Sequence, residues 1–331
     1  MVRKLNLAMK NNKVVALSLF IGLILFFFLH SCSTSSQPKE GFIDVEGGKI
    51  WYRIDGEGDK TPVLLLHGGP GSSSFYLEPL KELSDERPVI FIDQLGCGRS
   101  TRITDTTLMT IEKNVEQLEQ VRKALKLDQF YLYGHSWGTM LGLDYYLKYP
   151  KGIQALIFSS PLFSTKIWTD DADTLISKLP KAIQASIKES EKQYNFTNEA
   201  YQEAMKVYYK AYVRRSEKSK SQKDTAEKYF GSNVYTFMWG PSEFTATGNL
   251  LNYDRLKELT QIKLPTLLTA GEFDEARPSS VRYYTSLIPG AQFQLITQAA
   301  HSTMQDNPKE YNRILREFLR KMDTLQAPAT K

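Results

Sequence analysis

The chain has 331 residues, of which 41% are hydrophobic and 12% aromatic, so it can build a substantial core and a globally disordered protein is excluded. That length suits one large α/β domain or two ordinary ones. Of the formal net charge of +5, four positive charges lie in residues 1–31, which contain no acidic residue. The rest of the chain is close to neutral and has no basic stripe, which argues against a nucleic-acid partner.

An uncharged apolar run, VVALSLFIGLILFFFL, occupies residues 14–29 directly after the basic stretch. It is short for a membrane span and typical of the hydrophobic region of a signal peptide. The sequence Leu-His-Ser-Cys that follows resembles a bacterial lipobox, although His30 replaces the usual small residue. The pattern predicts a lipoprotein signal peptide over 1–31, a diacylglycerol on Cys32 and a polar linker over 32–40. An uncleaved anchor is the alternative, and both place the rest of the chain in the bacterial cell envelope, attached to the membrane.

After the linker, the hydrophobic pattern is that of an α/β domain. Residues 41–45 and 49–54 predict an N-terminal hairpin around a Glu-Gly-Gly turn. Short apolar runs, typical of strands buried on both faces, follow at 63–66, 89–92, 130–133, 153–159, 266–270 and 292–296. Amphipathic helices are predicted between them at 75–84, 110–126, 137–149, 279–288 and 307–323. This alternation predicts a mainly parallel sheet with helices on both faces.

The strand pattern is interrupted in the middle of the chain, over residues 162–247. This region is rich in Lys, Glu, Tyr and Ser and contains no convincing strand. Its periodicity predicts helices at 173–190, 198–215 and 223–230. Because the strands resume afterwards, we interpret the region as a helical cap inserted into a core formed by residues 41–161 and 248–325.

A candidate nucleophile lies between the predicted strand 130–133 and the predicted helix 137–149. Residues 134–138 read Gly-His-Ser-Trp-Gly, a G-x-S-x-G sequence. In this position the motif predicts a sharp strand-to-helix turn that exposes the serine, with glycines that let neighbouring backbone pass closely. The start of the helix supplies N–H groups for a developing oxyanion. The pattern therefore predicts that Ser136 is a nucleophile.

A serine hydroxyl needs a base to remove its proton, and the chain offers four histidines. His30 lies in the signal segment, His135 is next to the serine on the turn, and His67 begins a glycine-rich loop, where a structural hydrogen bond is expected. His301, in a loop after the predicted strand 292–296, is the remaining candidate base. The sequence GEFDEARP, directly after another predicted strand, supplies an acid in the required chain order, and Asp274 is our choice for the residue that orients the base.

The glycine-rich loop His-Gly-Gly-Pro-Gly follows the predicted strand 63–66. Glycines allow backbone N–H groups to approach a substrate oxygen closely. We therefore expect an oxyanion hole formed by the backbone N–H groups of Gly69 and Trp137.

The order and spacing of six motifs give the chain a specific resemblance. They are HGGPG, DQLGCGRS, GHSWG, MWGPSEFTATG, GEFDEARP and AAHSTMQDNP, and they extend over about residues 42–320. Together they resemble the proline iminopeptidase family of α/β-hydrolases, in particular its branch of tricorn-interacting aminopeptidases. The resemblance implies an α/β-hydrolase fold, and it places the Ser, Asp and His of that family on the three residues chosen above. The N-terminal lipoprotein segment departs from the pattern of most members.

The resemblance also implies an activity and further site residues. The family releases the N-terminal residue, often proline, from short peptides and uses no metal or other cofactor. The resemblance places two carboxylates that would hold the substrate ammonium group on Glu243 and Glu275. Pairing with carboxylates offsets the desolvation of that cation, which costs several kcal/mol. Glu272 stays unassigned, with a helix cap and a third anion as the alternatives.

Two other functions are compatible with parts of the sequence. A hydrolase of the same fold could act on esters, lactones or amides that lack a free amine, and it would not need the two carboxylates. A non-catalytic binding protein of this fold would be expected to lack members of the Ser–His–Asp set, all of which are present here. An aminopeptidase acting on short peptides is the function that the sequence favours.

Overall fold

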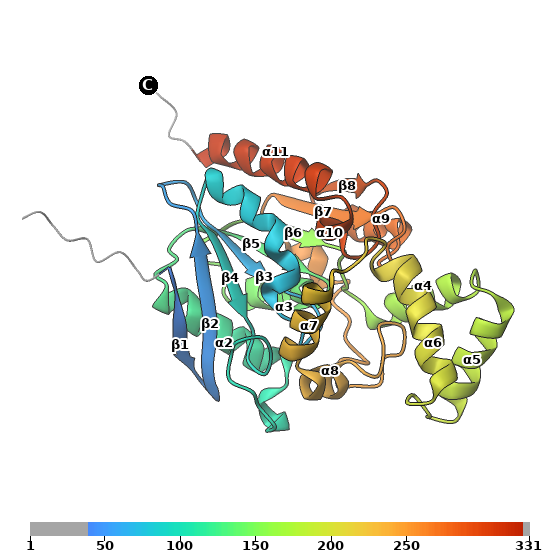
Figure 1. The fold of residues 1–331 in the computed structure, drawn as a ribbon. Helices are drawn as coiled ribbons and strands as arrows, with labels where there is room; N and C mark the ends of the chain where they lie inside the picture. Colours follow the sequence, from blue (N-terminus) through green and yellow to red (C-terminus); the bar gives the residue numbers. More distant parts are fainter. Residues whose placement is uncertain (1–38, 327–331) are drawn as a thin grey trace, which may run out of the picture. The chain divides into compact units, whose positions relative to one another are not determined.

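The computed structural model describes residues 39–326, and every structural statement below refers to them (Figure 1). An eight-stranded sheet forms the centre, in the order β1-β2-β4-β3-β5-β6-β7-β8. The first two strands form the antiparallel hairpin predicted from the sequence, β2 also pairs antiparallel with β4, and all other pairs are parallel. The strands are β1 (Glu40–Val45), β2 (Gly48–Asp55), β3 (Val63–Leu66), β4 (Val89–Asp93), β5 (Phe130–His135), β6 (Ile153–Ser159), β7 (Thr266–Gly271) and β8 (Gln292–Ile296).

Helices cover both faces of this sheet because the side chains of the central strands are apolar on both sides. Successive residues of β3 point to opposite faces, so that Leu64 belongs to one buried cluster and Leu65 to another. One cluster contains residues of α2 (Ile111–Ala124), α3 (Trp137–Lys148) and α9 (Pro278–Leu287). The other contains residues of the 3₁₀ helix η1 (Ser74–Asp85) and of α11 (Pro308–Gln326). The architecture is the doubly covered, mainly parallel sheet that the sequence predicted.

The carboxyl ends of the parallel strands all point to the same edge of the sheet, and this edge carries the residues singled out from the sequence. The chain leaves β3 to one side to form β4 and returns on the other side of β3 to form β5. Loops at such a reversal of strand order diverge and leave space for a ligand. The glycine-rich loop 67–71 and Ser136 follow the two strands at this point, β3 and β5.

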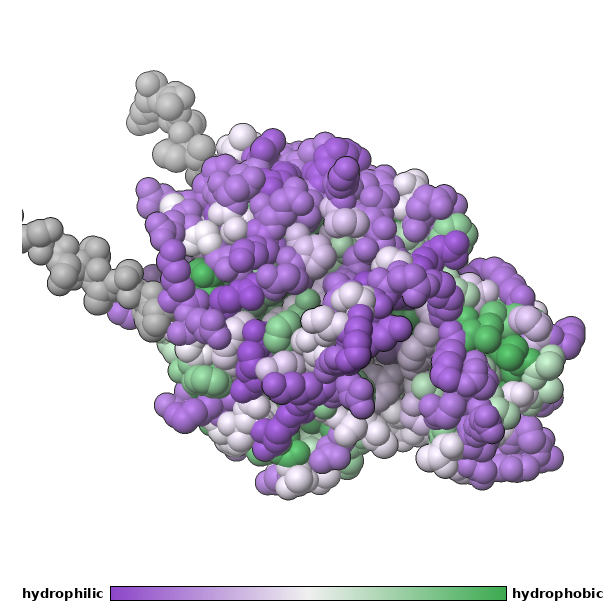
Figure 2. Space-filling model, in the orientation of Figure 1, coloured by the Kyte–Doolittle hydropathy of each residue, from purple (hydrophilic) through white to green (hydrophobic). Residues whose placement is uncertain are grey.

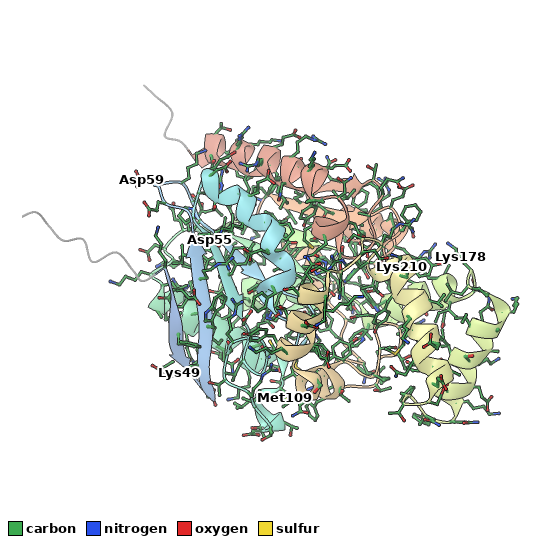
Figure 3. All side chains as sticks on the ribbon, viewed as in Figure 1. Lys49, Asp55, Asp59, Met109, Lys178 and Lys210 are labelled. Carbon is green, nitrogen blue, oxygen red and sulfur yellow. The ribbon has the colours of Figure 1, made fainter. Side chains whose placement is uncertain are left out.

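The region between β6 and β7 contains helices and no strand. They are α4 (Thr165–Ile176), α5 (Lys181–Lys192), α6 (Glu199–Tyr208), the π-helix η3 (Tyr209–Val213), α7 (Lys220–Tyr229), α8 (Ser232–Met238) and the 3₁₀ helix η4 (Glu258–Gln261). The first three form a group beside the sheet (Figure 1), with a small core of their own around Leu175, Ile187 and Tyr201. Lys178 and Lys210 mark this region in Figure 3, and Lys49 and Asp55 mark the two ends of β2.

Three predicted helices differ from the observed ones. The single helix predicted over 173–190 is wrong, because α4 and α5 are separate helices and Pro180 lies at the junction, as the N-cap residue of α5. The helix predicted over 75–84 has 3₁₀ rather than α geometry, and it contains Pro79, which lacks the N–H group that an α-helix requires. The helix predicted over 198–215 ends as α at Tyr208 and continues as the π-helix η3.

The predicted signal peptide, the lipidated Cys32 and most of the linker lie outside the described residues. Among the residues that the structure describes, no helix is both long enough and apolar enough to span a membrane.

Candidate active site

Ser136 occupies a strained turn between β5 and α3. Its backbone angles are φ 55° and ψ −126°, which non-glycine residues adopt at a cost on the order of 1–3 kcal/mol. The backbone holds this conformation: the Ser136 N–H donates to the carbonyl of Ser159 (3.0 Å), and the Ser136 carbonyl accepts from the Thr139 N–H (2.7 Å) and hydroxyl (2.6 Å). The sequence prediction of a sharp strand-to-helix turn at this serine is confirmed.

The two glycines of the G-x-S-x-G sequence are required by close backbone contacts. A methyl group on Gly138 would lie 2.3 Å from the carbonyl oxygen of Leu66, and one on Gly134 would lie 2.3 Å from that of Gly138. These positions are where α3 packs against β3 and where the turn folds back on itself. Any side chain there would displace backbone atoms, so the serine could not keep its place.

Asp274 and His301 form a buried pair at the ends of β7 and β8. The distance from Asp274 Oδ1 to His301 Nδ1 is 2.8 Å, and the two side chains are almost fully buried. The carboxylate also accepts hydrogen bonds from the N–H groups of Gly271 (3.1 Å) and Ala276 (2.8 Å) and from the hydroxyl of Ser160 (2.6 Å). These bonds fix the carboxylate so that it holds the imidazole in one orientation.

His135 connects the turn of Ser136 to His301 at the carboxyl edge of the sheet. The imidazole of His135, the residue before the serine, packs against that of His301, with ring centroids 4.7 Å apart. No hydrogen bond joins the Ser136 hydroxyl to His301 in the hydrogen-bond network of residues 39–326. Such bonds are often long without substrate and shorten when it binds.

The glycine-rich loop after β3 lies against the serine. A methyl group on Gly68 would lie 2.9 Å from Ser136 Cβ, and Gly69 has φ +116°, a conformation that favours glycine. The N–H of Gly68 donates to the hydroxyl of Tyr76 (2.6 Å). Within residues 39–326, the N–H groups of Gly69 and Trp137 have no acceptor. The predicted oxyanion donors are thus the free N–H groups that flank the serine.

His67 has a structural role in this loop. Its Nε2 accepts from the N–H of Gln94 (2.9 Å), so its Nδ1 carries the proton and donates to the carbonyl of Gly68 (2.9 Å). Burial lowers the pKa of His67 and keeps the ring neutral. Gln94 also accepts a bond from the indole N–H of Trp137 (2.7 Å), which ties the loop to the first residue of α3. This agrees with the prediction of a structural hydrogen bond at His67.

Glu275, next to Asp274, carries a buried carboxylate that faces the other side of the imidazole. Its Oε1 lies 3.8 Å from His301 Nε2, whereas Asp274 bonds Nδ1. The side chain is 1% exposed, and neither of its oxygens has a hydrogen-bond partner within residues 39–326. Burial, Glu243 and Asp274 together raise the pKa of Glu275 well above its ordinary value. Its partner-free oxygens are suited to accept hydrogen bonds from a ligand.

Glu243, on the loop after α8, lies near enough to Glu275 for its charge to raise the pKa of that carboxyl. Burial raises the pKa of Glu243 itself, while His301 acts in the opposite direction. Its backbone is held by the indole N–H of Trp168, which donates to the Glu243 carbonyl (2.8 Å), and by the Tyr209 hydroxyl, which accepts from the Glu243 N–H (3.1 Å). The residue as a whole is half-buried. The structure thus brings the second predicted carboxylate to the first from a distant part of the chain.

Two tyrosine hydroxyls at this position are also buried without a hydrogen-bond partner in the described residues, those of Tyr208 and Tyr235. The charges of Glu243 and Glu275 contribute to raising the pKa of both. Burial of unpaired polar groups is unfavourable, and a cluster of them indicates a place where a polar ligand binds. Sequence reasoning did not identify these tyrosines. The Tyr-Tyr-Lys-Ala-Tyr run at 208–212 was the available signal, but it also fits an ordinary helix core.

The π-helix η3 connects the helical region to the site. The carbonyl of Tyr212 accepts from the N–H of Glu275 (3.3 Å) and from that of His301 (3.0 Å). The carbonyl of Val213 accepts from the N–H of Ser302 (2.7 Å). One segment therefore holds the loops after β7 and β8 together. Sequence periodicity does not reveal π-geometry, so this connection was not predicted.

Glu272, which received no role from the sequence, lies at the protein surface. Its Oε2 accepts from the N–H of Gln298 (3.0 Å) and so links the two loops outside the site. The groups of three or more His, Cys, Asp or Glu side chains that could hold a metal ion are absent from residues 39–326.

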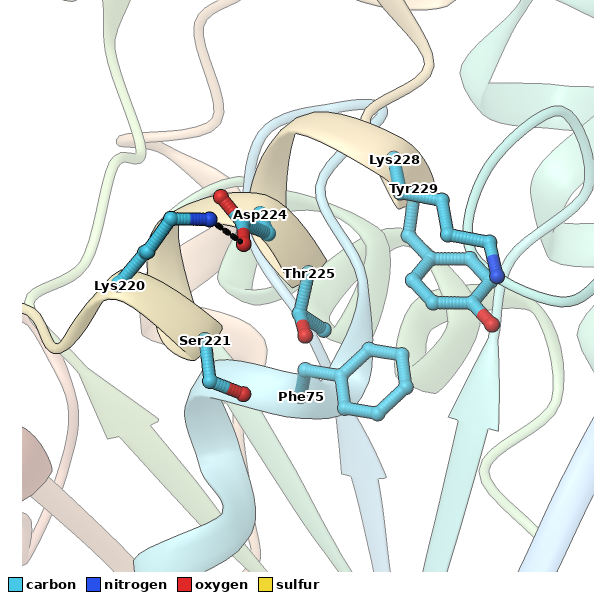
Figure 4. Close-up of a pocket in the computed structure, with 7 residues that line it drawn as sticks. All are labelled: Phe75, Lys220, Ser221, Asp224, Thr225, Lys228 and Tyr229. Carbon is cyan, nitrogen blue, oxygen red and sulfur yellow. Dashed lines mark hydrogen bonds and ion pairs between the residues drawn. The ribbon is translucent and has the colours of Figure 1, made fainter.

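Two open surface hollows lie away from these carboxylates. One, of about 520 Å³, lies between η1 and α7 and is lined by Phe75, Lys220, Ser221, Asp224, Thr225, Lys228 and Tyr229 (Figure 4). The other lies on α6 and η3 and is lined by Lys206, Val207, Lys210, Ala211 and Arg215. The surface is also hollowed between α7 and α6 (Figure 2). None of the predicted site residues lines the first two hollows.

Comparisons with known proteins agree with this geometry. Residues 61–308 match the family described as alpha/beta hydrolase fold. The chain is 44% identical over 284 residues to a proline iminopeptidase of Heyndrickxia coagulans, covering 85% of this chain and 98% of that protein. The crystal structure of VinJ superposes with a TM-score of 0.82 at 28% identity, and that of proline iminopeptidase from Mycobacterium smegmatis with 0.80 at 27%. Each covers 86% of this chain and 99% of the other. The chain therefore belongs to the proline iminopeptidase family within the α/β-hydrolases.

Proposed function

We propose that the protein is a serine aminopeptidase that releases the N-terminal residue, proline or another and often apolar one, from short peptides through an acyl-enzyme. The observation that carries the proposal is the partner-free, buried carboxylate of Glu275, 3.8 Å from His301 Nε2. A buried carboxylate without a partner is unfavourable, so a site that keeps one is suited to a cation. The α-ammonium group of a peptide is a cation next to the carbonyl that would react. The names of the relatives support this choice.

In the first half of the reaction, Ser136 attacks the first peptide carbonyl while His301 Nε2 accepts the hydroxyl proton. Asp274 stabilises the imidazolium that forms, because its carboxylate bonds Nδ1 at 2.8 Å. The free N–H groups of Gly69 and Trp137 bind the oxyanion, and each donor of this kind contributes about 3–4 kcal/mol. The first half ends when the imidazolium gives its proton to the departing amine.

In the second half, His301 activates a water molecule that hydrolyses the acyl-enzyme and frees the first residue. The imidazole must stay in place through both halves, and its surroundings provide for this. The ring packs edge to face on Trp168, with centroids 5.5 Å apart, and its backbone N–H bonds the carbonyl of Tyr212. No metal or other cofactor takes part in these steps.

Glu243 and Glu275 hold the substrate ammonium group in this proposal. Burial is the main cause that raises the pKa of both carboxyls, so their negative charges are unfavourable unless a cation lies beside them. A bound cation removes this penalty, and the hydroxyls of Tyr208 and Tyr235 can donate to the oxygens that remain. Residues 162–247 form a cap over the bound peptide. A substrate without the positive charge leaves the two carboxylates unpaired.

Aminoacyl-naphthylamides, each with a free and with an acetylated amine, test the proposal. We expect release from the free-amine compounds only, and we expect Glu243→Gln to abolish it while acetate-ester hydrolysis is spared. Equal turnover of the acetylated compounds would reject the aminopeptidase and leave a hydrolase of esters, lactones or amides. Equal loss of both activities in Glu243→Gln would reject the ammonium-binding role of this residue.

We also propose that the enzyme is a lipoprotein of the bacterial cell envelope, attached to the membrane through Cys32. The support is the sequence alone: a basic start, an apolar run at 14–29 and a cysteine three residues after the end of that run. Detergent phase partition of the full chain and of Cys32→Ser, with the mass of each product, tests this. The intact protein should enter the detergent phase as a processed, lipid-modified form. An unmodified mass, or a processed form without lipid, would refute the lipid anchor.

A further inference from the structure

A continuous chain of hydrogen bonds joins the glycine-rich loop to the loop of the candidate base, and it passes through two side chains that the reaction above does not use. The Gly68 N–H bonds the Tyr76 hydroxyl (2.6 Å), this hydroxyl bonds His135 Nδ1 (2.9 Å), and His135 Nε2 bonds the backbone carbonyl of His301 (2.9 Å). The chain starts on the residue before Gly69 and ends on the residue that carries the base.

The direction of every bond in this chain is determined by its two ends. A backbone N–H can only donate, so the Tyr76 oxygen accepts from Gly68 and its own hydrogen is free to donate to His135 Nδ1. The His301 carbonyl can only accept, so His135 Nε2 carries the proton. Both requirements are met by one neutral tautomer of His135. Burial and the neighbouring His301 lower the pKa of His135 well below its ordinary value, so the ring does not take up a second proton.

Packing restrains the two side chains in the same arrangement. His135 is 3% exposed, and its ring lies between those of Tyr76, with centroids 5.3 Å apart, and His301, with centroids 4.7 Å apart. The backbone carbonyl of Tyr76 accepts from the side-chain amide of Gln305 (2.5 Å), on α10 (Thr303–Asp306) directly after the His301 loop. Tyr76 is therefore tied to both loops, one through its hydroxyl and the other through its backbone.

We propose that Tyr76 and His135 are positioning residues that keep the oxyanion donor on Gly69 and the base on His301 at a fixed separation during acylation and deacylation. Ser136 lies between these two groups, and both must be aligned with the same tetrahedral carbon. Without the chain, the Gly68 N–H and the His301 carbonyl would each lose one hydrogen-bond partner, and the side-chain link between the two loops would be broken. The bonds from Gln305 to the Tyr76 carbonyl and from the Ser160 hydroxyl to the His301 carbonyl would remain, so we expect a loss of alignment and not of the fold. The inference rests on the proposed Ser136–His301 chemistry, but it does not depend on whether the substrate has a free amine.

Tyr76→Phe and His135→Phe, singly and together, test the inference with two substrates, an aminoacyl-naphthylamide and an acetate ester. We expect each single variant to lower kcat about 10- to 100-fold on both substrates and to change KM less than threefold, because misplaced groups slow the chemistry without removing the ammonium site. The kcat of the double variant should be little lower than that of the less active single variant, since either change breaks the same chain.

Tyr131→Phe is the matched control. Tyr131 lies near the start of β5, whereas His135 lies at its end, and the substitution removes a hydroxyl that bonds Asp323 (2.9 Å). It should retain full kcat. Labelling of Ser136 by a fluorophosphonate would give the concentration of folded sites, so that a misfolded fraction does not count as lost activity. A kcat within twofold of the original for Tyr76→Phe, losses that multiply in the double variant, or an equal loss in Tyr131→Phe would each overturn the inference. If the original protein hydrolyses only the ester, the aminopeptidase proposal fails, and the same comparison on the ester still decides the role of the chain.

Discussion

Replacement of Glu275 by Gln separates the binding of the substrate charge from the chemistry of the serine. The amide has nearly the same shape and can still accept hydrogen bonds, but it carries no charge. Glu275 has no hydrogen-bond partner within residues 39–326 that the substitution would disturb. The change therefore removes the charge and leaves the packing intact, and Asp274 still bonds His301.

The expected loss of activity follows from the burial of this carboxylate. Two opposite charges about 4 Å apart interact by roughly 4 kcal/mol at the effective dielectric constant of a partly buried site. Glu243 remains and the amide keeps an acceptor, so we expect a loss of about 2–4 kcal/mol, which is about 30- to 1000-fold in kcat/KM for free-amine substrates. Hydrolysis of an uncharged acetate ester should change less than threefold, because no ammonium group takes part.

The same substitution should stabilise the substrate-free protein, with a definite dependence on pH. The pKa of Glu275 is raised on folding, so its contribution to stability is present at low pH and is lost as the pH rises through the folded-state pKa. Gln does not titrate. Glu275→Gln should therefore unfold at the same temperature as the original near pH 4, and at a higher temperature at pH 8, by about 3 °C for each kcal/mol gained.

Glu272→Gln is the matched control for both measurements, because it makes the same chemical change in the same loop at the surface, where the carboxylate accepts a hydrogen bond from the Gln298 N–H. We expect it to leave kcat/KM and the unfolding temperature near their original values. The measurements are steady-state kinetics on the two substrates and thermal unfolding from pH 4 to 8. Unchanged kcat/KM for free-amine substrates in Glu275→Gln, or destabilisation of this variant at pH 8, would refute the reasoning.

Three further predictions follow from the site and the core. Because the pKa values of Glu243 and Glu275 are raised, kcat/KM for a free-amine substrate should fall at a higher pH on acidification than it does for an ester, and coincident profiles would contradict this. Gly138→Ala should reduce activity and fluorophosphonate labelling at least tenfold, since its methyl group would meet the Leu66 carbonyl at 2.3 Å; normal labelling would contradict this. Arg87→Met should lower the free energy of unfolding by about 2–4 kcal/mol, because it leaves a partly buried Asp323 without its guanidinium partner, and activity per folded site should not change.

Much of the fold was readable from the sequence because its signals are local. The apolar runs at 63–66 and 153–159 coincide with β3 and β6, since a strand buried on both faces needs a nearly continuous apolar segment. The run at 292–296 coincides with β8, but burial on both faces was wrongly predicted there, because β8 is an edge strand and is mostly only half-buried. The turn at Ser136 was recognisable for a related reason. Its glycines are required by atoms within a few residues or on the adjacent strand, so the requirement appears as a short motif.

Other features of the site were decided only by the tertiary structure. Tyr76, Tyr208 and Tyr235 look like ordinary core aromatics in the sequence, and their hydroxyls acquire a role only where segments distant in the chain meet. The π-geometry of η3 and the Tyr212 carbonyl that joins the loops of Glu275 and His301 leave no periodic signal. The physical reason is that apolar periodicity and glycine or proline positions report local backbone geometry, whereas the direction of a buried hydrogen bond depends on which distant groups are packed beside it.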